Sequence, residues 1–222
     1  MIHVFSAAVG YDVEKSPFFL TLSANPAAVS PGISLTLMTQ ASKHEPHIER
    51  LFLALEWARQ FSTEDKLVLS DFRDVVFQND LAEFPFDRPG IFFESGCYKD
   101  EPYNAAWLRR DYGDAFLMSV WNRPITCCGV VTGRQSFIVD YLEFCCRELE
   151  HLPSIQHGAD TSVHARYVWK NNLTYYQDNE RSPVYTVGLK KSIRIGKGII
   201  YNENGDKPFI VHQYDRHIGG LT

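Results

Sequence analysis

The sequence contains no stretch of about 18 consecutive apolar residues, the length that a membrane-spanning helix needs. It also lacks an excess of basic residues: 22 Lys and Arg stand against 27 Asp and Glu, for a formal net charge of −5. This balance gives no support to nucleic-acid binding, which normally uses a basic face. The apolar N-terminus has no basic leader, which predicts a strand at residues 2–7 rather than a signal peptide. We therefore expect a cytoplasmic protein, with peripheral membrane contact left open.

Cysteine is scarce and poorly spaced for cross-links. The five cysteines are Cys97, Cys127, Cys128, Cys145 and Cys146. Their number is odd, four of them form adjacent pairs, and no CxxC spacing occurs, so free thiols in a reducing compartment are expected. The sequence also lacks GxxxxGK[ST], GxGxxG and GxSxG. These absences remove the main support for a P-loop enzyme, a dinucleotide-binding enzyme or an α/β-hydrolase.

Strand-like and helix-like segments alternate along the chain. The chain has 222 residues, of which 45% are hydrophobic. This is enough for one sizeable hydrophobic core and too little for two domains of ordinary size. Strands are expected at residues 2–7, 33–39, 66–70, 75–77, 90–94, 126–132, 192–201 and 208–213, and helices at 18–22, 135–149 and 158–170. Another helix should follow residues 42–45, which match a capping box, whereas residues 97–124 are typical of a loop-rich stretch. This order predicts a single α/β domain with a mainly parallel sheet and flanking helices.

An apolar strand at residues 66–70 runs directly into Asp71, Arg73 and Asp74. Ligands of α/β sheets bind at the carboxyl ends of strands, and hard divalent cations prefer oxygen ligands. A metal held there can clamp a diphosphate and stabilise it as a leaving group. The alternative for an isolated DxxD is a solvated turn with an Asp–Arg ion pair.

Four motifs resemble those of one enzyme superfamily. Residues 71–78 read D-F-R-D-V-V-F-Q, which matches D-x-R-D-V-x-F-Q at each fixed position. Three further motifs follow in the order in which that superfamily carries them, at residues 126–129 (T-C-C-G), 158–160 (G-A-D) and 211–216 (V-H-Q-Y-D-R). The set resembles the nucleotide-diphospho-sugar glycosyltransferase superfamily with the GT-A fold and spans nearly the whole chain. The sequence departs from the common D-x-D motif by placing Arg73 third.

This resemblance implies a divalent metal site and a nucleotide site. Asp74 and His212 match metal ligands, and Asp71 matches a residue that holds either the metal or the ribose. Mn²⁺ or Mg²⁺ would be the cofactor, and an imidazole beside carboxylates suits Mn²⁺. The alternative for His212 is a strand-end histidine bonded to backbone. The residues expected at the nucleotide are Ser6, Arg50, Asp71, Arg73 and Arg216.

Two carboxylates are candidates for catalysis. Asp160 lies near the start of the last expected helix, and Glu94 ends an expected strand. An inverting transfer would need such a general base within reach of the acceptor hydroxyl. A helix N-cap is the alternative for Asp160, and a surface position is the alternative for Glu94. Thr161 replaces the glutamine of the matching G-x-D-Q pattern, which weakens an acceptor role for residue 161.

The resemblance implies transfer of a sugar from a nucleotide-diphosphate donor to a glycan or lipid-linked saccharide. A UDP-sugar is the expected donor, and bacterial surface-polysaccharide synthesis is the expected process. Residues 1–95 would form the nucleotide-sugar-binding half. Residues 96–222 would bind the acceptor and complete the metal site. Two alternatives stay open: a sugar-phosphate nucleotidyltransferase, although no Gly-rich loop follows the first strand, and a non-catalytic glycan-binding relative. A metal-dependent phosphohydrolase is a third, although it usually needs more His and Asp ligands.

Overall fold

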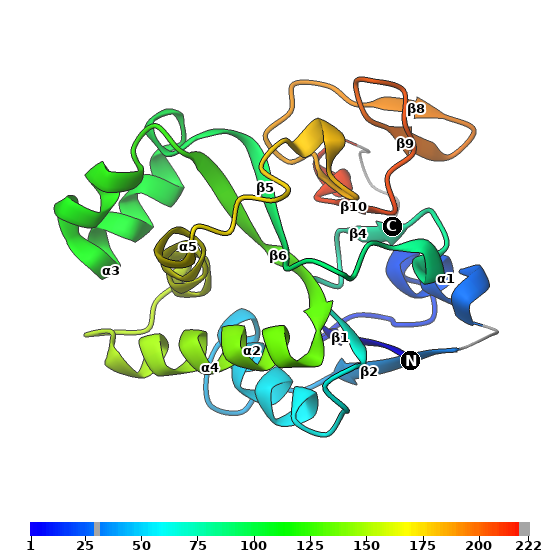
Figure 1. Ribbon diagram of the computed structural model, residues 1–222, viewed down its shortest axis with the longest axis horizontal. Coiled ribbons are helices and arrows are strands. Elements are labelled where there is room, and N and C mark those ends of the chain that lie inside the picture. The colour runs from blue at the N-terminus through cyan, green and yellow to red at the C-terminus, as the bar shows by residue number, and fades with distance from the viewer. Residues whose placement is uncertain (29–31, 218–222) are drawn as a thin grey trace.

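A five-stranded sheet with order β2-β1-β3-β6-β5 forms the centre of the protein (Figure 1). The computed structural model describes residues 1–28 and 32–217. The sheet strands are β1 (Ile2–Ala7), β2 (Ile33–Met38), β3 (Lys66–Ser70), β5 (Gly90–Cys97) and β6 (Pro124–Arg134). The helices are α1 (Pro17–Ser23), α2 (Pro46–Ala58), α3 (Pro102–Val120), α4 (Gln135–His151) and α5 (Ala159–Asn171). None of the helices in the described part of the chain combines the length and the apolar character that crossing a bilayer demands.

Two smaller sheets complete the fold. β4 (Val75–Phe77), β10 (Ile210–His212) and β7 (Val184–Thr186) form a three-stranded sheet in the order β4-β10-β7. β8 (Arg194–Gly196) and β9 (Ile199–Tyr201) form a hairpin. Short 3₁₀ turns lie at η1 (Pro26–Ala28), η2 (Leu81–Glu83), η3 (Tyr98–Asp100), η4 (Asn179–Arg181) and η5 (Tyr214–Arg216).

The central sheet is mixed, which corrects the expectation of a mainly parallel one. β1 pairs in parallel with both β2 and β3, but β6 pairs antiparallel with both β3 and β5. β6 lies between β3 and β5 instead of extending the sheet at an edge. Hydrophobic periodicity places a strand without giving its direction, so the reversal of β6 was not visible in the sequence. The α/β class and the single domain are confirmed.

Two hydrophobic clusters cover the two faces of the sheet. Leu67 and Leu69 of β3 face the cluster formed with α2, α3, α4 and α5. Val68, between them, faces the cluster formed with α1, β4, β7 and β10. This alternation follows from the two-residue period of a strand. Figure 1 shows α2, α4 and α5 grouped on one side of β6, with α1, β4 and β10 on the other.

Helix α3 occupies most of the stretch that was expected to be loop-rich. It begins at Pro102 after Glu101, whose carboxylate accepts a hydrogen bond from the Asn104 amide at 2.7 Å. Gly113 interrupts it with a left-handed φ of 78°, so two short helical segments follow each other. That break interrupts the helical spacing of the apolar residues, so the sequence pattern does not reveal the helix. A proline at the first helical position was a usable signal for its start.

Glu49, rather than Glu45, binds the segment that leads into α2. The helix begins at Pro46, and the side chain of its N-cap residue Glu45 makes no capping hydrogen bond, so the expected capping box is wrong. The Glu49 carboxylate instead accepts hydrogen bonds from the amides of Ser42, Lys43 and His44 at 2.7, 2.8 and 3.1 Å. The three backbone N–H donors favour the charged form and lower the pKa of Glu49 to about 2.

Replacing Glu49 by glutamine is expected to lower the melting temperature most at neutral pH. The pKa of Glu49 is depressed on folding, so its stabilisation is full above the ordinary value of 4.5 and disappears as the pH falls toward 2. Thermal unfolding followed by circular dichroism from pH 2 to 7 measures this. Glu56→Gln, on the exposed side of the same helix, is the control. If the melting temperatures of Glu49→Gln and wild type changed with pH in parallel, the stabilising role of the Glu49 carboxylate would be contradicted.

Candidate functional site

The expected metal residues meet where β3 ends. Asp71 and Asp74 follow β3 directly, and β4 begins at Val75. β10 pairs antiparallel with β4 and sets His212 opposite Val75. His212 Nε2 lies 3.3 Å from Asp71 Oδ2 and 3.7 Å from Asp74 Oδ1. One ligand atom from each of the three residues falls within 4.8 Å of the others. Pairing of β4 with β10 therefore joins ligands from distant parts of the chain.

Backbone contacts fix these residues in place. The Asp71 amide donates to the Gly129 carbonyl at 2.7 Å, and the Gln213 amide donates to the Asp74 carbonyl at 2.8 Å. Asp74 and His212 are 7% and 1% exposed, so their side chains have little freedom. A Cβ atom on Gly129 would overlap the His212 ring and lie 2.8 Å from Asp71 Oδ2. The absence of a side chain at residue 129 leaves the room in which the His212 ring and the Asp71 carboxylate meet.

The His212 ring also contacts a cysteine. Its Nδ1 lies 3.1 Å from Cys127 Sγ. Burial lowers the pKa of His212, but Cys127, Asp74 and Glu94 together outweigh that effect and raise the pKa to about 9. The imidazole therefore carries a proton between the carboxylates at neutral pH. A divalent cation would replace this proton, and two carboxylates with one imidazole are a ligand set that suits Mn²⁺.

Arg50 connects the metal candidates with Asp160. It projects from α2, forms an ion pair with Asp71, and places Nη2 3.4 Å from Asp160 Oδ2. Asp160 belongs to the first turn of α5, and its side chain is buried. Gly158, with a left-handed φ of 83°, is the N-cap residue of α5, so the capping role considered for Asp160 is not the one it has. The guanidinium instead holds two carboxylates in one network.

A single pocket of about 540 Å³ contains almost every expected site residue. It is lined by Arg50, Asp71, Arg73, Asp74, Glu94, Asp160, His212 and Arg216. Ser6 is the exception: it is buried, and its hydroxyl donates to the Ser70 carbonyl at 2.7 Å. The volume falls within the roughly 300–1,000 Å³ typical of ligand sites. Ser6 joins β1 to β3 and does not line this pocket.

The remaining candidates have different surroundings inside the pocket. Burial raises the pKa of Glu94, because it disfavours the charged carboxylate. Arg73 is mostly exposed and pairs through Nε with Asp215 Oδ2 at 3.1 Å. Arg216 lies close to Gly188, where a Cβ would fall 2.6 Å from its Nη1. Two arginines thus reach the pocket from the β4 and β10 side, next to the acidic cluster.

Two histidines of the pocket, His47 and His157, were not predicted from the sequence. The same cavity is lined by Trp107 and by Cys127 and Gly129 of the T-C-C-G motif. His47 was detectable, because it lies three residues before Arg50 on one helix and side chains at that spacing share a face. His157 had no comparable signal. Trp121 and Tyr112 lie elsewhere and pack against the larger hydrophobic cluster.

No protein-family model matches the chain, and no curated protein resembles it significantly. The geometry of this pocket and the motifs that line it are therefore the observations that bear on function.

Proposed function

We propose that the chain is a metal-dependent glycosyltransferase with a GT-A-like fold that uses a nucleotide-diphosphate sugar. The observation that carries the proposal is the convergence of Asp71, Asp74 and His212 beside β3, in a pocket large enough for a small ligand. Carboxylates at the end of a parallel strand are where an α/β sheet binds its ligand. The two nearby arginines supply the positive charge that a diphosphate needs.

Each side chain has a role consistent with its surroundings. Asp74 and His212 would hold Mn²⁺ or Mg²⁺, and Asp71 would hold either the metal or the ribose while paired with Arg50. The bound ion would neutralise the diphosphate and act as a Lewis acid on the leaving phosphate. Arg216 and Arg73 would bind phosphate oxygens, for which a planar guanidinium is well suited.

The acid–base chemistry would come from Asp160 or Glu94. Arg50 orients the Asp160 carboxylate toward the pocket and Asp71. Glu94 lies on β5, where burial raises the pKa of its carboxyl. A group that accepts a proton from the acceptor hydroxyl must come within hydrogen-bond reach of it, and both side chains line the pocket that would receive this hydroxyl. The donor we propose is UDP-linked, the acceptor a glycan or lipid-linked saccharide, and the location the cytoplasm.

Calorimetric titration of UDP, with and without Mn²⁺, tests the proposal. We expect UDP to bind with Mn²⁺ and to bind much more weakly without it, because the carboxylates repel an uncompensated diphosphate. ADP and GDP serve as comparison nucleotides, and a screen of nucleotide-sugars follows positive binding. Equal affinity with and without the metal would overturn the metal role. Absence of binding by every nucleotide would overturn the donor site and favour the glycan-binding alternative.

A further inference from the structure

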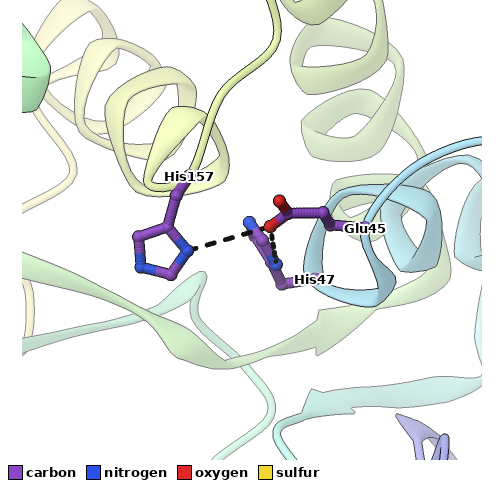
Figure 2. Close-up of side chains that lie close together, drawn as sticks. All are labelled: Glu45, His47 and His157. Atoms are coloured by element: carbon purple, nitrogen blue, oxygen red, sulfur yellow. Dashed lines mark ion pairs between the residues drawn. The ribbon is translucent and has the colours of Figure 1, made fainter.

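A second cluster of side chains that could bind a metal ion lies at the wall of the same pocket. Glu45 is the N-cap residue of α2, His47 lies in the first turn of that helix, and His157 precedes α5. Glu45 Oε2 lies 3.5 Å from His47 Nδ1 and 3.9 Å from His157 Nδ1. Figure 2 shows the three side chains pointing toward one another from two separate segments. The cluster shares no residue with Asp71, Asp74 and His212.

The spacing fits the coordination shell of a transition metal. Ligands about 2.0–2.1 Å from a tetrahedral ion lie about 3.4 Å apart, close to the two distances measured here. One ligand atom from each residue falls within 4.8 Å of the others, so small side-chain rotations would close the shell. Two imidazoles and a carboxylate form a common three-ligand set for zinc, with water in the fourth position.

The surroundings of His47 agree with this function. Its Nε2 atom is buried and has no hydrogen-bond partner among the described residues. The His47 and His157 rings meet edge to face at 5.0 Å. Among the described residues, no hydrogen bond therefore fixes the Nε2 side of the His47 ring.

The surroundings select the type of ion. The N-termini of α2 and α5 both lie near the cluster. Because helix N-termini carry partial positive charge, they repel a cation that is held only by electrostatic attraction. Imidazole nitrogens bind Zn²⁺, Co²⁺ and Ni²⁺ far better than Mg²⁺ or Ca²⁺. The side chains of Glu45 and His157 are 64% and 74% exposed, so an ion bound here stays accessible to solvent and can exchange. A hard cation would prefer the Asp71–Asp74–His212 cluster.

We propose that Glu45, His47 and His157 form a second metal site that binds Zn²⁺ or a similar transition metal and joins the start of α2 to the segment before α5. His47 and His157 line the pocket that also contains Arg50 and Asp160. An ion at this site therefore connects the two elements that supply the Arg50–Asp160 pair. Occupancy fixes the spacing of these elements, so the second site regulates the shape of the pocket wall.

Titration with Co²⁺ and Zn²⁺ in the absence of nucleotide tests this site independently of glycosyl transfer. The background is Asp74→Ala, which removes a ligand of the first cluster. We expect this protein to bind one Co²⁺ with the visible absorption of a tetrahedral ion, and Zn²⁺ to displace it. His157→Ala and Glu45→Gln should each weaken binding by more than about tenfold, since even groups that support metal ligands change affinity by that factor.

His151→Ala is the matched control, because His151 is an exposed histidine whose ring is bonded to the Arg147 carbonyl of its own helix. It should bind the metal as tightly as its background. The proposal is overturned if His157→Ala, with an unchanged circular dichroism spectrum, retains full affinity, or if Asp74→Ala alone abolishes Co²⁺ binding. Either result leaves the UDP titration unaffected, so the two proposals can fail separately.

Discussion

Replacing Asp74 by alanine is expected to abolish Mn²⁺-dependent UDP binding and to lower any transfer rate by more than about a thousandfold. Asp74 is buried 3.7 Å from His212 Nε2. Removing its carboxylate leaves two of the three candidate ligands. A metal acting on a leaving phosphate contributes several kcal/mol to the transition state, and about 4 kcal/mol corresponds to that factor. Calorimetry for binding and a donor-hydrolysis assay for the rate measure the two effects.

Two further variants separate loss of the metal from loss of the fold. Asp74→Asn keeps the size of the side chain and should show the same loss of metal-dependent binding. Asp114→Ala removes a highly exposed carboxylate of α3 that pairs with Arg109, and should behave as wild type. If Asp74→Asn bound UDP and Mn²⁺ with unchanged affinity, Asp74 would not be a metal ligand.

Gly129→Ala is expected to damage both stability and metal binding. A Cβ at this position on β6 would overlap the His212 ring and crowd the Asp71 carboxylate at 2.8 Å. His212 is buried against Cys127 and cannot move away without breaking that contact. Overpacking of a buried site costs about 1–3 kcal/mol, which for this size corresponds to a fall in melting temperature of roughly 2–12 °C. Mn²⁺ affinity should fall with it, because the two ligands are pushed apart.

Gly196→Ala is the matched control for this experiment. The added Cβ would lie 3.5 Å from Tyr201 in the β8–β9 hairpin, an ordinary contact. Scanning calorimetry and metal titration on both variants distinguish a local clash from a general effect of adding a methyl group. A Gly129→Ala protein with wild-type melting temperature and wild-type Mn²⁺ affinity would show that residue 129 is not packed against the ligands as described.

The sequence located the acidic half of the candidate site through local pattern alone. An apolar strand that runs into Asp71 and Asp74 is visible without a structure, and β3 ends where it was expected to end. The contribution of His212 was predicted only through motif resemblance, because nothing local shows that β10 pairs with β4. Periodicity encodes which residues of a strand are buried. It does not encode which strand becomes the neighbour.

The remaining differences between prediction and structure have similar causes. The direction of β6 depends on how α3 returns the chain to the sheet, and a left-handed Gly113 concealed α3 itself. Arg50 was expected near the nucleotide only from the resemblance. Its pairing with Asp71 and Asp160 requires α2 and α5 to approach the end of β3 together. The local sequence around Arg50 gives no sign of that approach.

The β4–β10 pairing also has a consequence for the order of events during synthesis. His212 follows Asp71 by 141 residues, so at about 5–20 residues per second it leaves the ribosome roughly 7–30 s later. During that interval the two carboxylates have no imidazole beside them. The nascent chain thus exposes an acidic turn instead of a finished binding cavity. A ligand that needs His212 could therefore bind only after β10 has been made and has paired with β4.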